Sequence, residues 1–136
     1  MQILSSSVDQ TRQAGNRLAQ SAHAGDIFAL IGELGCGKTE FVRGFVASLC
    51  DSCNVRSPTF TIVNIYDTPA YPIYHFDFYR LKKAEELIEI GFSEYIQGQG
   101  VCFIEWADLF PQALPQNTCQ IRFFDTGNGQ RSIEIY

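Results

Sequence analysis

Gly32-Glu33-Leu34-Gly35-Cys36-Gly37-Lys38-Thr39 is the stretch of the sequence that decides its fold. It matches the pattern G-x-x-x-x-G-K-[ST] of a P-loop, in which glycines leave room for backbone N–H groups to point at a phosphate chain. Lys38 supplies a mobile ammonium for the terminal phosphates, and the Thr39 hydroxyl is a suitable ligand for Mg²⁺. The candidate nucleotide contacts here are Gly32, Glu33, Leu34, Gly35, Cys36, Gly37, Lys38, Thr39 and Glu40.

The segments on both sides of this loop follow in the order that a P-loop requires. Residues 26–31 form a short apolar run, typical of a strand buried on both faces. Phe41, Phe45 and Leu49 then recur every four residues, which gives a helix one apolar face. This order places a helix N-terminus against the phosphates. We predict an α/β, P-loop NTPase-like three-layer domain with a mixed, mostly parallel central sheet and antiparallel strands at the edge. The alternative is a glycine-rich turn between ordinary elements.

Length and charge narrow the classes of protein. The chain has 136 residues, so we expect a single domain over residues 1–136. Its 10 Lys and Arg against 15 Asp and Glu give a net charge of −5, which disfavours direct binding to nucleic acid phosphates. A role on RNA would then need a partner that holds the RNA. There is no signal-peptide pattern and no long apolar run, so we expect a cytoplasmic protein without a membrane partner.

The five cysteines, Cys36, Cys50, Cys53, Cys102 and Cys119, show no repeated metal-ligand spacing. The pair Cys50-x-x-Cys53 is a weak zinc or redox candidate, and free thiols in a reducing compartment are the expected state. Cys36 stands inside the P-loop, at a helix N-terminus that is expected to lower the pKa of a thiol. We therefore expect oxidants and alkylating agents to modify Cys36 and to block nucleotide binding.

Periodicity, capping residues and turn residues outline the other elements. Ser7 and Gln10 have the spacing of a capping box and begin a helix with an apolar face of Val8, Ala14 and Leu18. The further predicted elements are the end of that helix near Ala22 with Gly25 as its stop, strands over 59–66 and 71–79 in a hairpin, a helix over 82–90, a buried parallel strand over 101–105, and closing strands over 120–124 and 132–136.

Polar and aromatic residues alternate in His75-Phe76-Asp77-Phe78-Tyr79-Arg80-Leu81. In a strand, His75 and Asp77 share one face. A carboxylate there would orient water or bind Mg²⁺ through water, and Arg80 would pair with it or with phosphate. The alternative is a solvated strand face. The earlier loop Arg56-Ser57-Pro58-Thr59 lies where nucleotide-binding domains often place a γ-phosphate sensor, although an ordinary loop fits equally well.

Glu105 directly follows the apolar run Val101-Cys102-Phe103-Ile104. A buried parallel strand would deliver this carboxylate to the sheet edge where the P-loop lies, and an acid there usually completes the Mg²⁺ site. Glu105 would bind the metal or activate water; the alternative is an unpartnered acid at a strand end. Trp106 would stack on a base or pack as lid or core. Arg131 would reach a nucleotide or stay exposed at a hairpin.

Four motifs in this order resemble the TsaE family of small bacterial P-loop ATPases. They are residues 32–39, Ser57-Pro58-Thr59-Phe60, residues 75–81 and Ile104-Glu105-Trp106. The similarity runs from the N-terminal helix to the last strand. Because the P-loop is common to many proteins, the other three motifs at these spacings carry the specific resemblance. The sequence departs from the family at Cys36, where Ala is usual, and at Glu40, which adds negative charge near the helix start.

The resemblance implies an ATPase that acts with TsaB and TsaD proteins in making threonylcarbamoyladenosine, with tRNA held only through that complex. It implies Lys38 on phosphate, Thr39 and Glu105 on Mg²⁺, Asp77 in hydrolysis, residues 57–59 as a switch-like loop, and Thr59, Trp106 and Arg131 at the nucleotide. The catalytic residues are then Lys38, Asp77 and Glu105, and the cofactors are ATP and Mg²⁺.

The expected reaction is Mg²⁺-assisted attack of water on the γ-phosphate, with Asp77 or Glu105 orienting the water. The P-loop contains no arginine finger, so turnover should be slow without partners. Two other functions remain open. One is a nucleotide-gated binding module in which hydrolysis is incidental, and the other is a small-molecule P-loop kinase.

Overall fold

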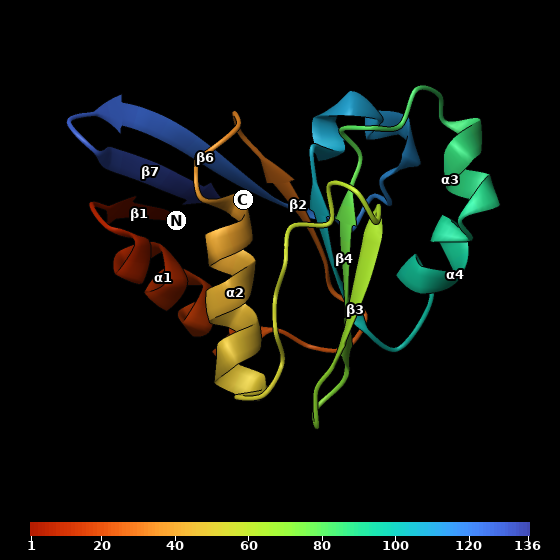
Figure 1. The fold of residues 1–136 in the computed structure, drawn as a ribbon, viewed down its shortest axis with the longest axis horizontal. Helices are drawn as coiled ribbons and strands as arrows, with labels where there is room; N and C mark the ends of the chain where they lie inside the picture. The colour runs from red at the N-terminus through yellow and green to blue at the C-terminus, as the bar shows by residue number, and fades with distance from the viewer.

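The computed structural model describes residues 1–136 and contains a seven-stranded sheet with helices on both faces (Figure 1). In chain order the elements are β1 (Gln2–Ser5), α1 (Val8–Ser21), β2 (Ile27–Ile31), α2 (Lys38–Leu49), β3 (Val63–Asp67), β4 (Pro72–Asp77), α3 (Glu85–Glu89), α4 (Phe92–Ile96), β5 (Val101–Glu105), two 3₁₀ turns (Ala107–Leu109 and Pro111–Ala113), β6 (Cys119–Gly127) and β7 (Gln130–Ile135). No helix is both long enough and apolar enough to cross a membrane.

The strands lie in the order β1-β7-β6-β2-β5-β4-β3. The four central strands β6, β2, β5 and β4 run parallel, whereas β7, β1 and β3 join antiparallel at the two edges. This confirms the predicted α/β fold. The register pairs Leu30 of β2 and Asp77 of β4 with Glu105 of β5. The carboxyl ends of these parallel strands therefore bring both acids to the edge at which the chain leaves β2 for the P-loop.

Two aromatic cores hold the three layers together. Helices α1 and α2 cover one face of the sheet, and the short helices α3 and α4 cover the other (Figure 1). Under α2, the rings of Phe28 and Phe103 stack with centroids 5.2 Å apart, and Phe45 meets Phe103 edge-on at 4.8 Å. On the other face, Phe92 of α4 meets Phe76 edge-on at 5.1 Å. Burial of each such side chain stabilises the fold by roughly 1.5–3 kcal/mol.

The N-terminal segment differs in part from its prediction. Ser7 caps α1 and Gln10 bonds back to the backbone of Ser6, so the predicted helix start is correct. The buried face, however, consists of Thr11, Ala14, Gly15 and Ala19, whereas Val8 is half-exposed. The helix ends at Ser21, and Gly25 lies in the following turn with φ of 96°. Strand β1 was not predicted.

The middle of the chain is less regular than its sequence pattern indicates. The first hairpin strand begins at Val63 instead of residue 59, because residues 59–62 form a turn in which the Ile62 N–H bonds the Pro58 carbonyl and Ile62 has φ of 70°. The second strand covers only Pro72–Asp77, and the helix predicted over 82–90 shortens to Glu85–Glu89. Before α3, the Glu86 carboxylate accepts the N–H groups of Lys82 and Lys83, which keeps those residues outside the helix.

The cysteines at the end of α2 correct the expectation that every thiol is free. Cys50 is the extended residue that ends α2, so the chain turns back and brings the Cα of Cys53 within 5.6 Å, where the two form a disulfide. Cys36, Cys102 and Cys119 are free. No three His, Cys, Asp or Glu side chains gather as a metal site, so the zinc alternative for this pair finds no support in the fold.

Helices α1 and α2 pack closely because Gly15 of α1 and Gly44 of α2 have no side chain at their contact. A Cβ on Gly44 would lie 1.9 Å from the Arg12 carbonyl oxygen. Gly44→Ala must push the helices apart, so we expect the free energy of unfolding to fall by about 1–3 kcal/mol although alanine favours helix. Urea denaturation measures this. The exposed α1 variant Gln13→Ala is the control, and equal stability of both variants would contradict the account.

Candidate nucleotide site

Residues 32–37 connect β2 to α2 and form the loop of the site. Gly35 and Gly37 have φ of 77° and 102°, a left-handed conformation that disfavours side chains. Gly37 is the residue before α2, and its carbonyl accepts the first helical bond, from the Phe41 N–H. The N–H groups of this first helical turn have no partner within the helix and face the loop. The N-terminus of α2 is therefore suited to bind an anion.

Lys38 lies almost buried in the loop with no carboxylate partner. Its ammonium donates to the Gly32 carbonyl and lies 3.8 Å from the centroid of the Trp106 ring. A carbonyl and an aromatic face stabilise a cation without neutralising it. The positive charge of Lys38 is therefore available to an anion in the loop.

Trp106 is held in an unusual backbone conformation. Its φ of 59° is rare for a bulky residue, and the adjoining 3₁₀ turn with fully buried Ala107 fixes it there. The centroid of the Tyr79 ring lies 5.0 Å from that of the Trp106 ring. Glu105 ends β5 and Trp106 follows it directly. The end of this strand thus places a carboxylate and an indole near Lys38.

Thr39 and Glu105 meet as the sequence predicted. The Thr39 hydroxyl donates to Glu105 Oε2 over 2.9 Å, which joins the first turn of α2 to the end of β5. His75 Nε2 lies 2.6 Å from the same oxygen, and His75 is fully buried. Glu105 therefore has partners, and the alternative of an unpartnered acid is wrong.

Asp77 is 2% exposed, so the solvated strand face considered for the stretch from His75 to Arg80 is also wrong. Its carboxylate accepts the Tyr79 N–H over 2.8 Å and the Thr59 hydroxyl over 3.0 Å. Burial raises the pKa of Asp77 above its ordinary value, and these two hydrogen bonds offset the shift only in part. A buried carboxylate with a raised pKa is typical of functional sites.

The loop before β3 contacts Asp77 through Thr59. The hydroxyls of Ser57 and Thr59 lie 2.8 Å apart, so the loop presents two hydroxyls next to a buried acid. Arg80 does not pair with Asp77, contrary to one expectation, because its guanidinium lies over the ring of Phe60, 5.0 Å from the centroid. Phe60 itself is 83% exposed at the tip of the loop.

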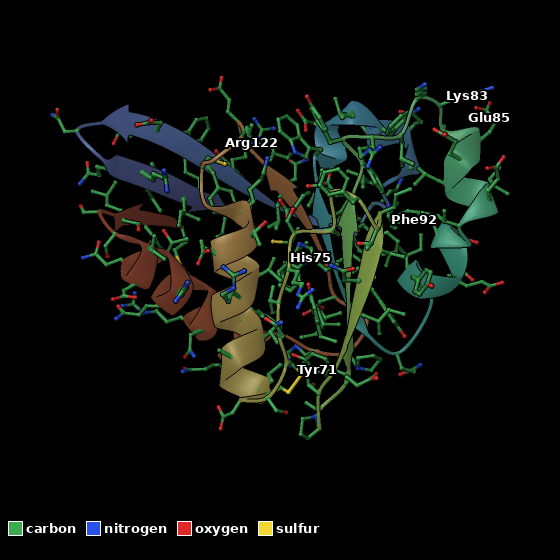
Figure 2. The ribbon with its side chains drawn as sticks, viewed as in Figure 1. Tyr71, His75, Lys83, Glu85, Phe92 and Arg122 are labelled. Carbon is green, nitrogen blue, oxygen red and sulfur yellow. A yellow bond between two sulfur atoms is a disulfide. The ribbon has the colours of Figure 1, made fainter.

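Two adjoining cavities surround these residues. The smaller, of about 340 Å³, contains the loop, Lys38, Thr39, Glu40, Ser57, Thr59, Asp77 and Glu105 in its walls. The larger, of about 440 Å³, lies toward β6 and adds residues that the sequence did not single out, among them Asp108, Arg122, Phe124 and Asp125. Leu34, Gly35, Cys36, Trp106 and Arg131 line both. Figure 2 labels Arg122 beside β6 and His75 near the centre of the molecule. The arrangement suits a long ligand with an anionic end and a planar end.

Glu40 does not present a free negative charge at the helix start. Burial alone would raise the pKa of Glu40, but hydrogen bonds from Arg12 and Arg43 outweigh it and lower the pKa. Arg12 Nε lies 2.7 Å from the Glu40 carboxylate. The charge expected from this departure in the sequence is thus paired with two guanidinium groups.

Cys36 corrects the prediction of a reactive thiol. The residue is 5% exposed, and a Cβ on Gly32 would lie 2.7 Å from its sulfur. Burial raises the pKa of the Cys36 thiol, and the charges of Lys38 and Arg131 and backbone hydrogen bonds only partly oppose this. Desolvation outweighs the helix N-terminus because Cys36, although it lines both cavities, is packed into the core cluster.

Comparison with known proteins decides the family. The family model described as threonylcarbamoyl adenosine biosynthesis protein TsaE matches residues 5–133. This chain belongs to the TsaE family. It is 41% identical over 125 residues to the tRNA threonylcarbamoyladenosine biosynthesis protein TsaE of Bacillus subtilis, covering 92% of this chain and 78% of that protein. The protein of the same name from Treponema pallidum is 34% identical over 135 residues, which is 99% of both chains.

A solved structure shows the same fold. The crystal structure of Bacillus subtilis YdiB superposes with a TM-score of 0.81 at 34% sequence identity, covering 98% of this chain and 82% of that one. The TsaE resemblance in the sequence is therefore confirmed, both in the family and in the fold.

The burial of Cys36 leads to a labelling prediction. At neutral pH, iodoacetamide should label the partly buried Cys119 well before the buried Cys36. Burial raises the pKa of both thiols, so the contrast rests on access of the reagent to the sulfur. In urea both thiols should react at similar rates. Peptide mass spectrometry measures the two sites separately. Labelling of Cys36 as fast in the folded protein as in urea would contradict its burial.

Proposed function

We propose that this TsaE protein binds Mg-ATP in the two adjoining cavities and hydrolyses it slowly, in tRNA threonylcarbamoyladenosine biosynthesis with TsaB-type and TsaD-type partners. The observation that carries the proposal is the convergence of Lys38, Thr39, Asp77 and Glu105 on one cavity beside the P-loop. The names of the relatives support the pathway. We place the protein in the cytoplasm because tRNA modification is the pathway that its relatives' names give. We assign contact with tRNA to the partners, because the chain carries a net charge of −5.

The side-chain oxygens of Thr39 and Glu105 are suitable ligands for a magnesium ion. Mg²⁺ prefers oxygen ligands and is usually held by one or two protein groups together with phosphates and water. The Thr39 hydroxyl and the Glu105 carboxylate are such oxygens, and they lie within hydrogen-bond distance of each other. When bound, the ion would offset charge on the β- and γ-phosphates.

The other side chains of the site have separate roles in binding and hydrolysis. The ammonium of Lys38 binds phosphate oxygens from its place between the Gly32 carbonyl and Trp106. Asp77 accepts a proton from, or orients, the attacking water, and burial raises the pKa of this carboxyl, which makes it a stronger base than an exposed one. Thr59 holds the Asp77 carboxylate in position. Trp106 and Arg131, which line both cavities, contact the nucleotide.

One observation favours the binding module as a second function. Leu34 and Phe60, at the two loops beside the site, are 88% and 83% exposed. Large exposed apolar side chains are suited to contact with a partner. Nucleotide would then order the contact surface, and hydrolysis would be incidental. Glu105→Gln separates the two functions: nucleotide binding retained with loss of tRNA modification favours the ATPase, and modification retained favours the module.

The ATPase predicts dependence on partners. Phosphate release from Mg-ATP should be well below one per second for the protein alone, because no arginine finger lies in the loop. Matching TsaB and TsaD proteins should stimulate it, and Lys38→Ala should abolish the stimulated rate. A rate of one per second or faster without partners would contradict this dependence.

Asp77 should contribute to function at the expense of stability. Because its pKa is raised in the folded protein, the folded state binds protons more strongly than the unfolded chain, and wild-type stability falls as the pH rises through the folded pKa. Asp77→Asn removes that loss, keeps an oxygen for the Tyr79 N–H and should abolish hydrolysis. At neutral pH the variant should be at least as stable as wild type in urea.

The pH dependence provides the control for this variant. The stability difference between Asp77→Asn and wild type should shrink on acidification toward the ordinary carboxyl pKa, where the wild-type carboxyl also becomes neutral. A variant that is less stable than wild type at neutral pH and hydrolyses ATP normally would contradict the role given to Asp77.

A further inference from the structure

We propose that His75 is a positioning residue that holds the Glu105 carboxylate for Mg²⁺, and that Tyr66 couples this hold to the loop carrying Ser57 and Thr59. The inference rests on the proposed Mg-ATP site and names the residues that set its metal ligand in place. It concerns two side chains outside the P-loop that do not themselves reach phosphate.

The contacts of Glu105 leave one oxygen available. His75 Nε2 lies 2.6 Å from Oε2, and since an ionised carboxylate only accepts, the imidazole is the donor. The Thr39 hydroxyl donates to the same Oε2 over 2.9 Å. The protein makes no hydrogen bond to Oε1, while Glu105 lines the cavity. Two donors on one oxygen therefore fix the carboxylate plane and leave the other oxygen for a metal or its water.

Through Nδ1, the imidazole of His75 is linked to the loop before β3. The Tyr66 hydroxyl lies 3.0 Å from His75 Nδ1 and 2.9 Å from the Arg56 carbonyl oxygen, and it accepts the Arg56 N–H over 3.3 Å. With Nε2 donating to Glu105, Nδ1 of the neutral imidazole is an acceptor, so the hydroxyl gives its single hydrogen to Nδ1 and stays linked to the loop by accepting the Arg56 N–H. Arg56 directly precedes Ser57, so the network runs without a break from that loop to Thr39.

Burial of the His75 imidazole costs desolvation free energy, and packing alone does not explain why a polar side chain occupies this position. The side chain is fully buried on the α2 side of β4, on the same face as Ile73 and opposite the fully buried Phe103 of β5. An apolar residue there would avoid the desolvation of two ring nitrogens. The imidazole is compensated because both nitrogens have partners, and its rigid ring spans the distance from Tyr66 to Glu105. Groups that orient a metal ligand in this way typically contribute 10–100-fold to metal affinity or activity.

The test separates the affinity gained through the metal from the affinity for the nucleotide alone. Calorimetric titration of the full chain with a non-hydrolysable ATP analogue, in Mg²⁺ and in EDTA, gives the affinity gained through the metal. His75→Asn keeps a polar group near Tyr66 but does not reach Glu105, and it should lose about 10–100-fold in Mg²⁺ with no change in EDTA. His75→Gln, whose amide nitrogen extends to the position of Nε2, should recover most of the loss.

Tyrosine variants provide a second route that spares the histidine. Tyr66→Phe should show a smaller loss in Mg²⁺ only. Tyr71→Phe is the matched control, because the Tyr71 hydroxyl is buried without a hydrogen-bond partner and Figure 2 places Tyr71 apart from His75. Its affinity in both conditions should equal that of wild type. Should His75→Asn not fold, the comparison of these two tyrosine variants carries the test alone.

The outcomes distinguish the inference from the function on which it rests. An equal gain through Mg²⁺ in wild type, a folded His75→Asn and Tyr66→Phe would overturn the inference and leave the Mg-ATP site standing. Equal losses in Mg²⁺ and in EDTA would show a structural role only and would also overturn it. A wild-type protein with no gain through Mg²⁺ would overturn the proposed function and the inference together.

Discussion

The hydrogen bond from the Thr39 hydroxyl to the Glu105 carboxylate is the contact on which the rest of the site depends. It joins residues 66 positions apart, one in the first turn of α2 and one at the end of β5, one of the four central strands. Parallel pairing of β2 with β5 makes the contact possible, because both strands end at the same edge of the sheet. The two aromatic cores pack against the two faces of the sheet that carries this edge. The helix N-terminus, Lys38 and the carboxylate therefore share one cavity.

Burial of polar groups is the cost of this arrangement. Lys38, His75, Asp77 and Glu105 are all nearly inaccessible to water, in a small protein whose buried residues are mostly apolar. Each is compensated by a specific partner: a carbonyl and an indole for Lys38, two oxygens for the imidazole, and donors for both carboxylates. A half-satisfied network of this kind would destabilise the fold. The network thus constrains the site as much as the P-loop does.

The sequence predicted the parts of the fold that local pattern determines. The P-loop, its flanking elements and Glu105 at the end of an apolar run were placed correctly, because motif and periodicity act over a few residues. Four features depend on distant neighbours and were missed. Strand β1 forms by pairing with β7 at the other end of the chain, and the turn at Ile62 needs φ of 70°. Cys36 is buried by core residues, and His75 is buried because both ring nitrogens form hydrogen bonds, one with Tyr66 and one with Glu105.

A crystal structure with Mg²⁺ and a non-hydrolysable ATP analogue would test the central claim most directly. We expect the phosphates in the loop of residues 32–37, the Lys38 ammonium moved from the Gly32 carbonyl to a phosphate oxygen, and the metal between Thr39 and Glu105. We also expect His75 still bonded to Glu105. An analogue bound elsewhere, or one bound in the loop with the Thr39–Glu105 hydrogen bond intact and no metal beside it, would contradict the account.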